Sequence, residues 1–186
     1  MNIPNQLTTL RLLLVPVFLW ALYLQGPSPD EVRWVALAVF LIASITDFFD
    51  GYLARIWNMI TVYGKVMDPL ADKVLVTAAL VAFADFHWIP AWTVVIVLSR
   101  EFLITGLRTI LAEQGEMMGA GMLGKIKTNV QMIAVVLFLV GAPLAGWWMY
   151  VLAVIVTVLS GVDYVWRSRK VLATFTDSPA PPPQGT

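Results

Sequence analysis

The chain has 186 residues, of which 59% are hydrophobic and 13% are charged, and its mean hydropathy is +0.79. Soluble domains are about 45–50% apolar and about 25% charged, so this composition excludes an ordinary soluble protein and indicates an all-α integral membrane protein. Twelve basic and twelve acidic residues give no net charge, and nothing in this balance points to nucleic acid. Since the chain has no cysteine, disulfides and cysteine-ligated metals are excluded.

Apolar runs bounded by Pro, Gly or charged residues predict six transmembrane helices, because about 20 residues cross a bilayer. The predicted spans are 7–25, 32–50, 69–86, 90–111, 126–140 and 146–166. Residues 1–5 are predicted to form a short segment at the membrane interface. We expect residues 1–170 to form a single membrane domain and the tail 171–186, which contains four prolines, to be disordered.

The placement of Lys and Arg predicts the orientation of these spans, since positive residues stay on the cytoplasmic side. With six spans, Arg33 is the one basic residue on the far side, and Arg100 lies inside the fourth span. The others fall on the opposite side or at its helix ends. Both termini are therefore predicted to be cytoplasmic, together with the connections 51–68 and 112–125.

Four carboxylates lie where the second span ends and the third begins. Asp47 and Asp50 are three residues apart, and Asp68 and Asp72 are four apart, so each pair shares a helix face. An uncompensated carboxylate in a membrane costs roughly 2.5–3.5 kcal/mol at mid-bilayer. Because the candidate ligands are oxygens, Mg²⁺ or Mn²⁺ is the cation that fits. Such ions keep coordination positions open for phosphate oxygens, which indicates a phosphorylated substrate.

Helix capping is the alternative interpretation of two of these positions. Asp68 precedes Pro69 and would suit an N-cap with proline in the first turn, and Gly51 would suit a helix C-terminus. Capping does not explain Asp47, Asp50 or Asp72, so we favour the metal site.

The same residues resemble the signature of the CDP-alcohol phosphatidyltransferases, membrane enzymes of phospholipid synthesis. The match is Asp47-x-x-Asp50-Gly51-x-x-Ala54-Arg55, eight residues, then Gly64-x-x-x-Asp68-x-x-x-Asp72. The resemblance implies the fold of this family, with six transmembrane helices. It also implies the reaction of the family, in which an alcohol displaces CMP from a CDP-linked lipid. Members of this family lie among membrane lipids and form homodimers, so the resemblance implies both for this chain. Because the chain is most similar to bacterial members, the resemblance also implies a place in the bacterial inner membrane.

The resemblance further implies a role for each matching residue. Asp47, Asp50, Asp68 and Asp72 would be metal ligands, and Asp72 would also take the proton from the attacking hydroxyl. The residues expected to contact the CDP-lipid, CDP-diacylglycerol, are Asn5, Thr8, Gly51, Ala54, Arg55, Thr61 and Gly64. For Asn5 and Thr8, capping of the first helix is the alternative.

Four basic residues are candidates for binding the phosphate of the acceptor alcohol: Arg100, Arg108, Lys125 and Lys127. A guanidinium deep in an apolar helix should face a polar cavity, although Arg100 could instead pair locally with Glu101. The opening segment, Ser99-Arg100-Glu101 and Gly124-Lys125-x-Lys127-Thr128 resemble most closely the family members whose acceptor is sn-glycerol 3-phosphate.

Other functions remain open at this point. A cardiolipin synthase of the same family, with phosphatidylglycerol as acceptor, would also bind a phosphate, and inositol-phosphate or serine acceptors are further alternatives. A divalent-cation transporter would also place carboxylates in the membrane. However, all four acids lie at one membrane face, so no ion path across the membrane is indicated.

Overall fold

The protein is described by a computed structural model that covers residues 3–56, 62–113 and 121–176, with side chains described for 9–46, 73–111 and 121–169. These ranges form helices and contain no strand. The helices are α1 (Ile3–Leu24), α2 (Trp34–Ile56), α3 (Val62–Asp85), α4 (Ala91–Glu113), α5 (Met122–Leu139) and α6 (Pro143–Thr176). The predicted all-helical architecture is therefore confirmed over the described residues.

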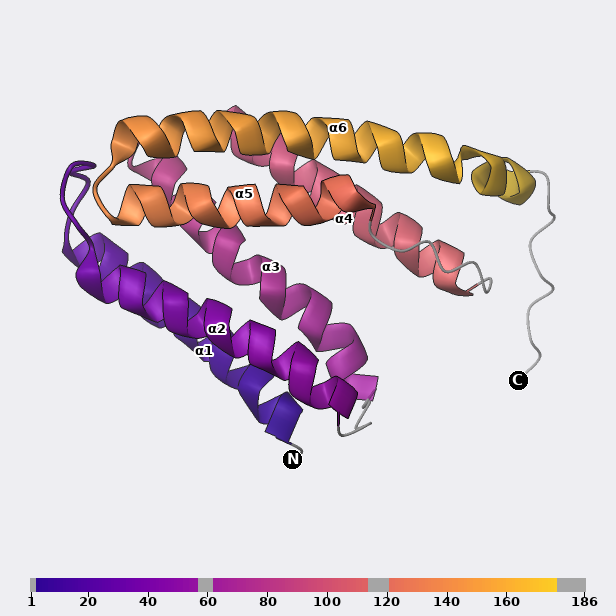
Figure 1. Ribbon diagram of the computed structural model, residues 1–186, viewed down its shortest axis with the longest axis horizontal. Helices are drawn as coiled ribbons and strands as arrows, with labels where there is room; N and C mark the ends of the chain where they lie inside the picture. Colours follow the sequence, from indigo (N-terminus) through magenta and orange to yellow (C-terminus); the bar gives the residue numbers. More distant parts are fainter. Residues whose placement is uncertain (1–2, 57–61, 114–120, 177–186) are drawn as a thin grey trace.

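The helices form two antiparallel pairs with two helices crossing between them (Figure 1). α1 packs against α2, and α5 packs against α6. α3 lies against α1, whereas α4 lies against α6. The two pairs converge at the end where their short connections lie and diverge toward the other end (Figure 1).

Glycine and proline set several helix ends. α1 stops at Leu24, and Gly26 follows with a φ of +77° before Pro27. α5 ends at its C-cap Val140, after which Gly141 has a φ of +73°. Glycine adopts this left-handed conformation without a Cβ penalty. Pro143 opens α6, where the missing N–H costs no helical hydrogen bond.

Several predicted boundaries were wrong, because several helices continue beyond the apolar runs from which they were predicted. α2 continues to Ile56 and α3 begins at Val62, so Gly51 and Asp68 lie inside helices and neither can cap one. The predicted interfacial segment is continuous with α1 from Ile3 onward. α6 extends to Thr176 instead of ending at 166, so residues 171–176 are helical; the rest of the predicted tail lies outside the described residues.

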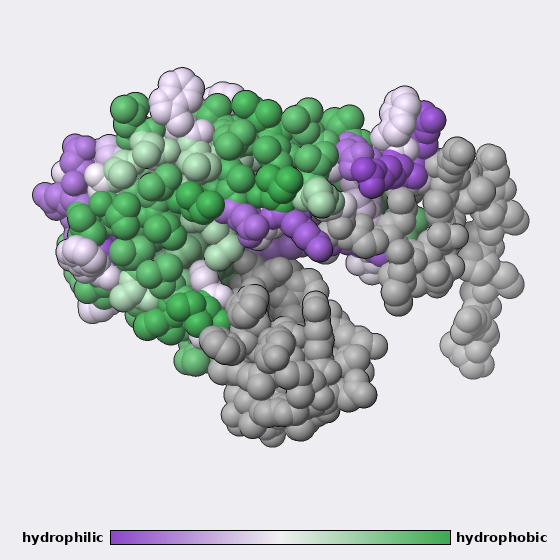
Figure 2. All heavy atoms as spheres, in the orientation of Figure 1, coloured by the Kyte–Doolittle hydropathy of each residue, from purple (hydrophilic) through white to green (hydrophobic). Residues whose placement is uncertain are grey.

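Length and hydropathy support membrane crossing most clearly for α5 and α6. Within the described residues, Met122–Leu139 and Pro143–Arg169 are long and apolar enough to span a bilayer. Thr9–Leu24 and Trp34–Thr46 are shorter apolar helical stretches. Hydrophobic side chains cover most of the described face, and hydrophilic ones gather in a band between the two pairs (Figure 2). Six complete spans are thus a proposal rather than a finding.

The hydrophobic core occupies the half of the bundle nearest the short connections. Phe18 and Phe40 pack with ring centroids 5.9 Å apart, and Phe83 and Phe138 are 5.1 Å apart. All four rings are at most 2% exposed. Close packing of these rings stabilises this half of the bundle through van der Waals contacts between the helices.

Arg33 holds the connections together at this end. Its side chain is fully buried and donates hydrogen bonds to the backbone carbonyls of Gly26, Ser28 and Glu31. Its guanidinium lies 4.4 Å from the centroid of the Trp88 ring. The Arg33 backbone N–H donates to the carbonyl of Leu139 at 2.8 Å. One side chain therefore links the α1–α2 loop to the α3–α4 loop, while its backbone reaches α5.

Gly141→Ala should destabilise the protein more than Gly26→Ala. Both glycines have positive φ, which costs an L-residue about 1–2 kcal/mol. A Cβ on Gly141 would also lie 2.7 Å from the Asp30 carbonyl oxygen, whereas one on Gly26 would meet nothing within 4 Å. We expect a loss of about 2–5 kcal/mol for Gly141→Ala, measured by thermal unfolding in detergent. Equal losses in the two variants would contradict the steric contribution.

Candidate active site

The four aspartates of the predicted metal site lie on two helices that contact each other. Asp47 and Asp50 are in the last turns of α2, and Asp68 and Asp72 are in the first turns of α3. Their spacing of three and four residues along continuous helices puts each pair on one helix face. The aspartate side chains lie outside the described residues, so the sequence motif is placed here by its backbone.

The expected CDP-lipid contacts lie on the same helix ends. Gly51, Ala54 and Arg55 follow the first two aspartates on α2, and Gly64 precedes the second two on α3. Asn5 and Thr8 are in the first two turns of α1, which packs against both helices. Thr61 lies outside the described residues.

All four basic residues predicted to bind the acceptor phosphate line one cavity. Arg100 and Arg108 come from α4, and Lys125 and Lys127 come from α5. The cavity has a volume of about 430 Å³, and Lys73 and Glu101 also line it. Among the described residues, the charged side chains that line this cavity are thus five cations and one carboxylate. This excess of positive charge attracts an anion.

Arg100 is held inside this cluster by two side-chain contacts. Its guanidinium lies 3.4 Å from a carboxylate oxygen of Glu101 and donates to Ser160 Oγ at 3.0 Å. Gly161 lets α6 approach, since an added Cβ there would lie 3.1 Å from Arg100 Cγ. Arg100 therefore lines the polar cavity that the sequence predicted. It also pairs with Glu101, which was the alternative prediction for this residue.

A second cavity of about 220 Å³ lies on the α6 side of Arg100 and Arg108. Tyr164 and Arg167 of α6 line it. The Arg108 guanidinium lies 5.5 Å from the Tyr164 ring centroid. Among the described residues, the buried Arg100 Nε, Arg108 Nε and Tyr164 Oη have no hydrogen-bond partner. Buried unpaired donors are uncommon in folded proteins, so this region favours a ligand with hydrogen-bond acceptors.

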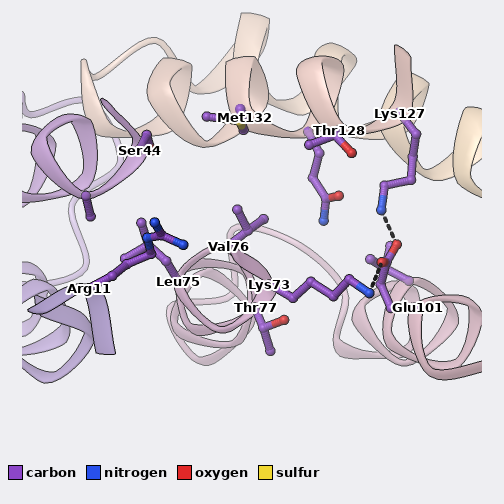
Figure 3. A pocket seen from close by; sticks show the side chains of 13 residues that line it. Arg11, Ser44, Lys73, Leu75, Val76, Thr77, Glu101, Lys127, Thr128 and Met132 are labelled. Atoms are coloured by element: carbon purple, nitrogen blue, oxygen red, sulfur yellow. Dashed lines mark hydrogen bonds and ion pairs between the residues drawn. The ribbon is translucent and has the colours of Figure 1, made fainter. Parts of the chain in front are cut away.

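A third cavity, of about 120 Å³, lies between α1, α2, α3, α4 and α5 (Figure 3). Arg11 reaches it from α1, and Lys73 and Lys127 reach toward Glu101 on the other side (Figure 3). Arg11 is 2% exposed. A buried cation thus lines this largely apolar cavity, together with residues of α2 and α3, the helices that carry the motif.

Glu101 and Lys73 were missed as site residues. The sequence shows Glu101 only as the neighbour of Arg100, and Lys73 was not among the predicted acceptor-binding cations. In the structure Lys73 lies 3.7 Å from Glu101 and donates to Thr105. Ser160, Tyr164 and Arg167 were also missed. Their spacing along α6, with Gly161 among them, was the one available signal of a polar face.

A family profile and several known proteins match this chain, and they agree on the family. The sequence profile of the family described as CDP-alcohol phosphatidyltransferase matches residues 1–159. A Bacillus subtilis CDP-diacylglycerol–glycerol-3-phosphate 3-phosphatidyltransferase is 43% identical, over 93% of this chain and 98% of its own length. A probable phosphatidylglycerophosphate synthase of Mycobacterium tuberculosis is 44% identical, over 91% of this chain and 82% of its own. A Rickettsia bellii protein with the same name as that of B. subtilis is 35% identical, over 91% and 96%.

Proposed function

Because this chain belongs to the CDP-alcohol phosphatidyltransferase family, we propose that it transfers the phosphatidyl group of CDP-diacylglycerol to sn-glycerol 3-phosphate, releasing CMP and forming phosphatidylglycerophosphate. The names of the B. subtilis and R. bellii relatives state this pair of substrates. The observation that carries the acceptor is the cavity lined by Arg100, Arg108, Lys125 and Lys127. An acceptor without a phosphate would have no need of this cluster.

The cavity suits a phosphate monoester in size and in charge. Its volume of about 430 Å³ falls within the range of small-molecule sites. A phosphate monoester carries about −1.5 to −2 charge at pH 7, which the excess of described cations offsets. The Arg100 and Arg108 guanidinium groups present a planar fork of donors that matches phosphate oxygens. In this proposal they hold the acceptor with its hydroxyl toward the motif helices.

The donor set of the motif fits a hard divalent cation. Four carboxylates at spacings of three and four residues on two contacting helices supply oxygen ligands of the kind that Mg²⁺ and Mn²⁺ bind. Asp47, Asp50, Asp68 and Asp72 would hold the ion. When bound, it would offset the negative charge of the diphosphate as the bond to CMP breaks.

Asp72 is the proposed general base. A glycerol hydroxyl is a weak nucleophile, and a carboxylate within hydrogen-bond reach can take its proton as the new bond to phosphorus forms. Asp72 directly precedes Lys73, whose side chain lines the acceptor cavity, which supports a place for Asp72 near the acceptor. Arg55 would hold a phosphate group of the donor, and the small residues Gly51 and Ala54 would let the nucleotide approach α2.

The proposed setting is the bacterial inner membrane, with six spans and both termini on the cytoplasmic side. The positions of the basic residues support this orientation. The motif helix ends and the phosphate-binding cavity then face the compartment that contains water-soluble glycerol 3-phosphate.

A direct assay tests the function. Purified full-length protein in detergent, given CDP-diacylglycerol, Mg²⁺ and glycerol 3-phosphate, should release CMP and form phosphatidylglycerophosphate in equal amounts. Release of CMP with phosphatidylglycerol as the sole acceptor would instead support the cardiolipin synthase alternative. No release with either acceptor would contradict the proposal, and Mn²⁺ uptake into vesicles containing the protein would favour a transporter.

Removing one acceptor cation should weaken glycerol 3-phosphate binding selectively. A hydrogen bond to a charged group contributes about 1.5–3 kcal/mol, so Arg100→Ala or Lys125→Ala should raise the KM for glycerol 3-phosphate roughly 10- to 150-fold. The KM for CDP-diacylglycerol should change much less. Arg169→Ala is the matched control, since Arg169 is exposed and stacks on Trp166 at 3.9 Å. Equal effects on both KM values would place Arg100 and Lys125 outside the acceptor site.

A further inference from the structure

We propose that Glu101 is a positioning residue for the acceptor: its carboxylate holds Lys127, Arg100 and Lys73 in the arrangement that receives the acceptor phosphate. This inference rests on the proposed function, because it assigns Glu101 a role in binding the second substrate. Glu101 was assigned no role in the sequence analysis beyond pairing with Arg100, and it carries the charge opposite to the one that a phosphate site requires.

The contacts of Glu101 draw on three helices. Lys127 of α5 and Arg100 of α4 both contact Glu101 Oε1, and Lys73 of α3 lies 3.7 Å from Oε2. Lys73 and Lys127 approach the carboxylate from opposite sides (Figure 3). One carboxylate therefore fixes three cations that lie far apart in the sequence.

The side chains in these ion pairs are largely buried, so each charge depends on its partner for compensation. The Glu101 side chain is 12% exposed, the Lys127 side chain 6% and the Arg100 side chain 13%. A charge this far from water needs a partner, and removing one member of a buried pair leaves the other uncompensated. Without Glu101, Lys127 would have to move or lose its proton. Either change would alter the arrangement of positive charges that binds the acceptor phosphate.

Glu101 stands in the wall between two cavities. The cavity of about 430 Å³ and the cavity of about 120 Å³ share Lys73, Glu101, Lys127 and Thr128 as lining residues. The larger cavity contains the basic residues proposed to bind the acceptor, and the smaller one lies between five helices that include α2 and α3, which carry the aspartate motif. The position of Glu101 therefore fixes the cations at the place where the two spaces meet.

Glu101 acts through its partners and not on the substrate. Both of its oxygens already face cations, so neither is free to take a proton from the acceptor hydroxyl. Ordered cations lose less side-chain entropy when the phosphate arrives, because they are already in place. The effect of Glu101 should thus be felt in the affinity for the acceptor and should depend on Lys127.

A double-mutant cycle on the full-length protein in detergent tests this dependence. Glu101→Gln should raise the KM for glycerol 3-phosphate about 10-fold and leave the KM for CDP-diacylglycerol within about 2-fold. Lys127→Met should raise the same KM, and the double variant should raise it by clearly less than the product of the two single effects, because part of the effect of Glu101 passes through Lys127. Glu31→Gln is the control, because Glu31 is exposed at the opposite end of the molecule.

Three outcomes would overturn the proposal: multiplicative effects of Glu101→Gln and Lys127→Met, equal changes in the two KM values, or an unchanged KM for glycerol 3-phosphate in Glu101→Gln. Should Glu101→Gln fail to fold, Glu101→Asp keeps the charge, and its KM should rise less than 10-fold; a larger rise would also overturn it. Absence of phosphatidylglycerophosphate from the wild-type protein would instead contradict the proposed function.

Discussion

Asp72→Asn is expected to lower kcat by about 10²- to 10⁴-fold, the usual contribution of a positioned general base. Asparagine keeps the shape of the side chain but cannot take the proton of the glycerol hydroxyl. Because that proton belongs to the acceptor, binding of CDP-diacylglycerol should stay within a few-fold of the wild-type value. CMP release at saturating substrate gives kcat, and calorimetric titration with CDP-diacylglycerol gives the affinity.

Asp85→Asn is the matched control for this variant. Asp85 ends the same helix, α3, and accepts a hydrogen bond from Tyr23 Oη at 2.8 Å. Thirteen residues separate the two aspartates, about 20 Å along a helix, so Asp85→Asn should retain activity. Loss of CDP-diacylglycerol binding in Asp72→Asn would assign Asp72 mainly to the metal, and unchanged turnover would contradict its role as base.

Removal of divalent cations is expected to reduce CMP release by about 10³-fold or more. Without the divalent cation, no metal charge would offset the negative charges of the four aspartates and of the diphosphate. This loss would raise the activation free energy by several kcal/mol. Treatment with EDTA followed by added Mg²⁺ or Mn²⁺ should restore the rate. Full activity after exhaustive chelation would contradict the metal site.

A binding measurement separates the metal's role from general instability. Titration of Mn²⁺ into the chelated protein, followed by its paramagnetic resonance signal, should show tight binding that Asp47→Asn weakens at least 10-fold. Asp163→Asn serves as the control, since Asp163 pairs with Arg167 at 2.9 Å on α6, which carries no residue of the motif. Equal weakening in the two variants would argue against ligation by Asp47.

The helices of the described residues and a polar cavity around Arg100 could be predicted from the sequence, because both depend on strong signals. Apolar runs of near-bilayer length predict helices wherever they occur. Arg100 in the middle of such a run needs a polar environment, and the structure supplies one lined also by Arg108, Lys125 and Lys127.

Helix ends and the partners of the cations could not be predicted. Gly51 and the Asp68-Pro69 pair carry local signals of helix termini, but α2 and α3 continue through them. The contacts of Glu101 with Lys73 and Lys127 join residues 28 and 26 positions apart on three helices. No periodicity within one helix encodes such a meeting, since it depends on how the helices cross.

The Arg33 contacts hold the end of α2 that is farther from the aspartate motif. α2 starts beside Arg33 and is 23 residues long, about 35 Å, with the aspartate motif at its opposite end. Asp47 and Asp50 lie 13 and 16 residues beyond Trp34, about 20–24 Å along the helix, so a rotation of about 5° about that end would shift them by about 2 Å. A small angular change at the convergent end would therefore displace the aspartates by about the length of a metal–oxygen bond.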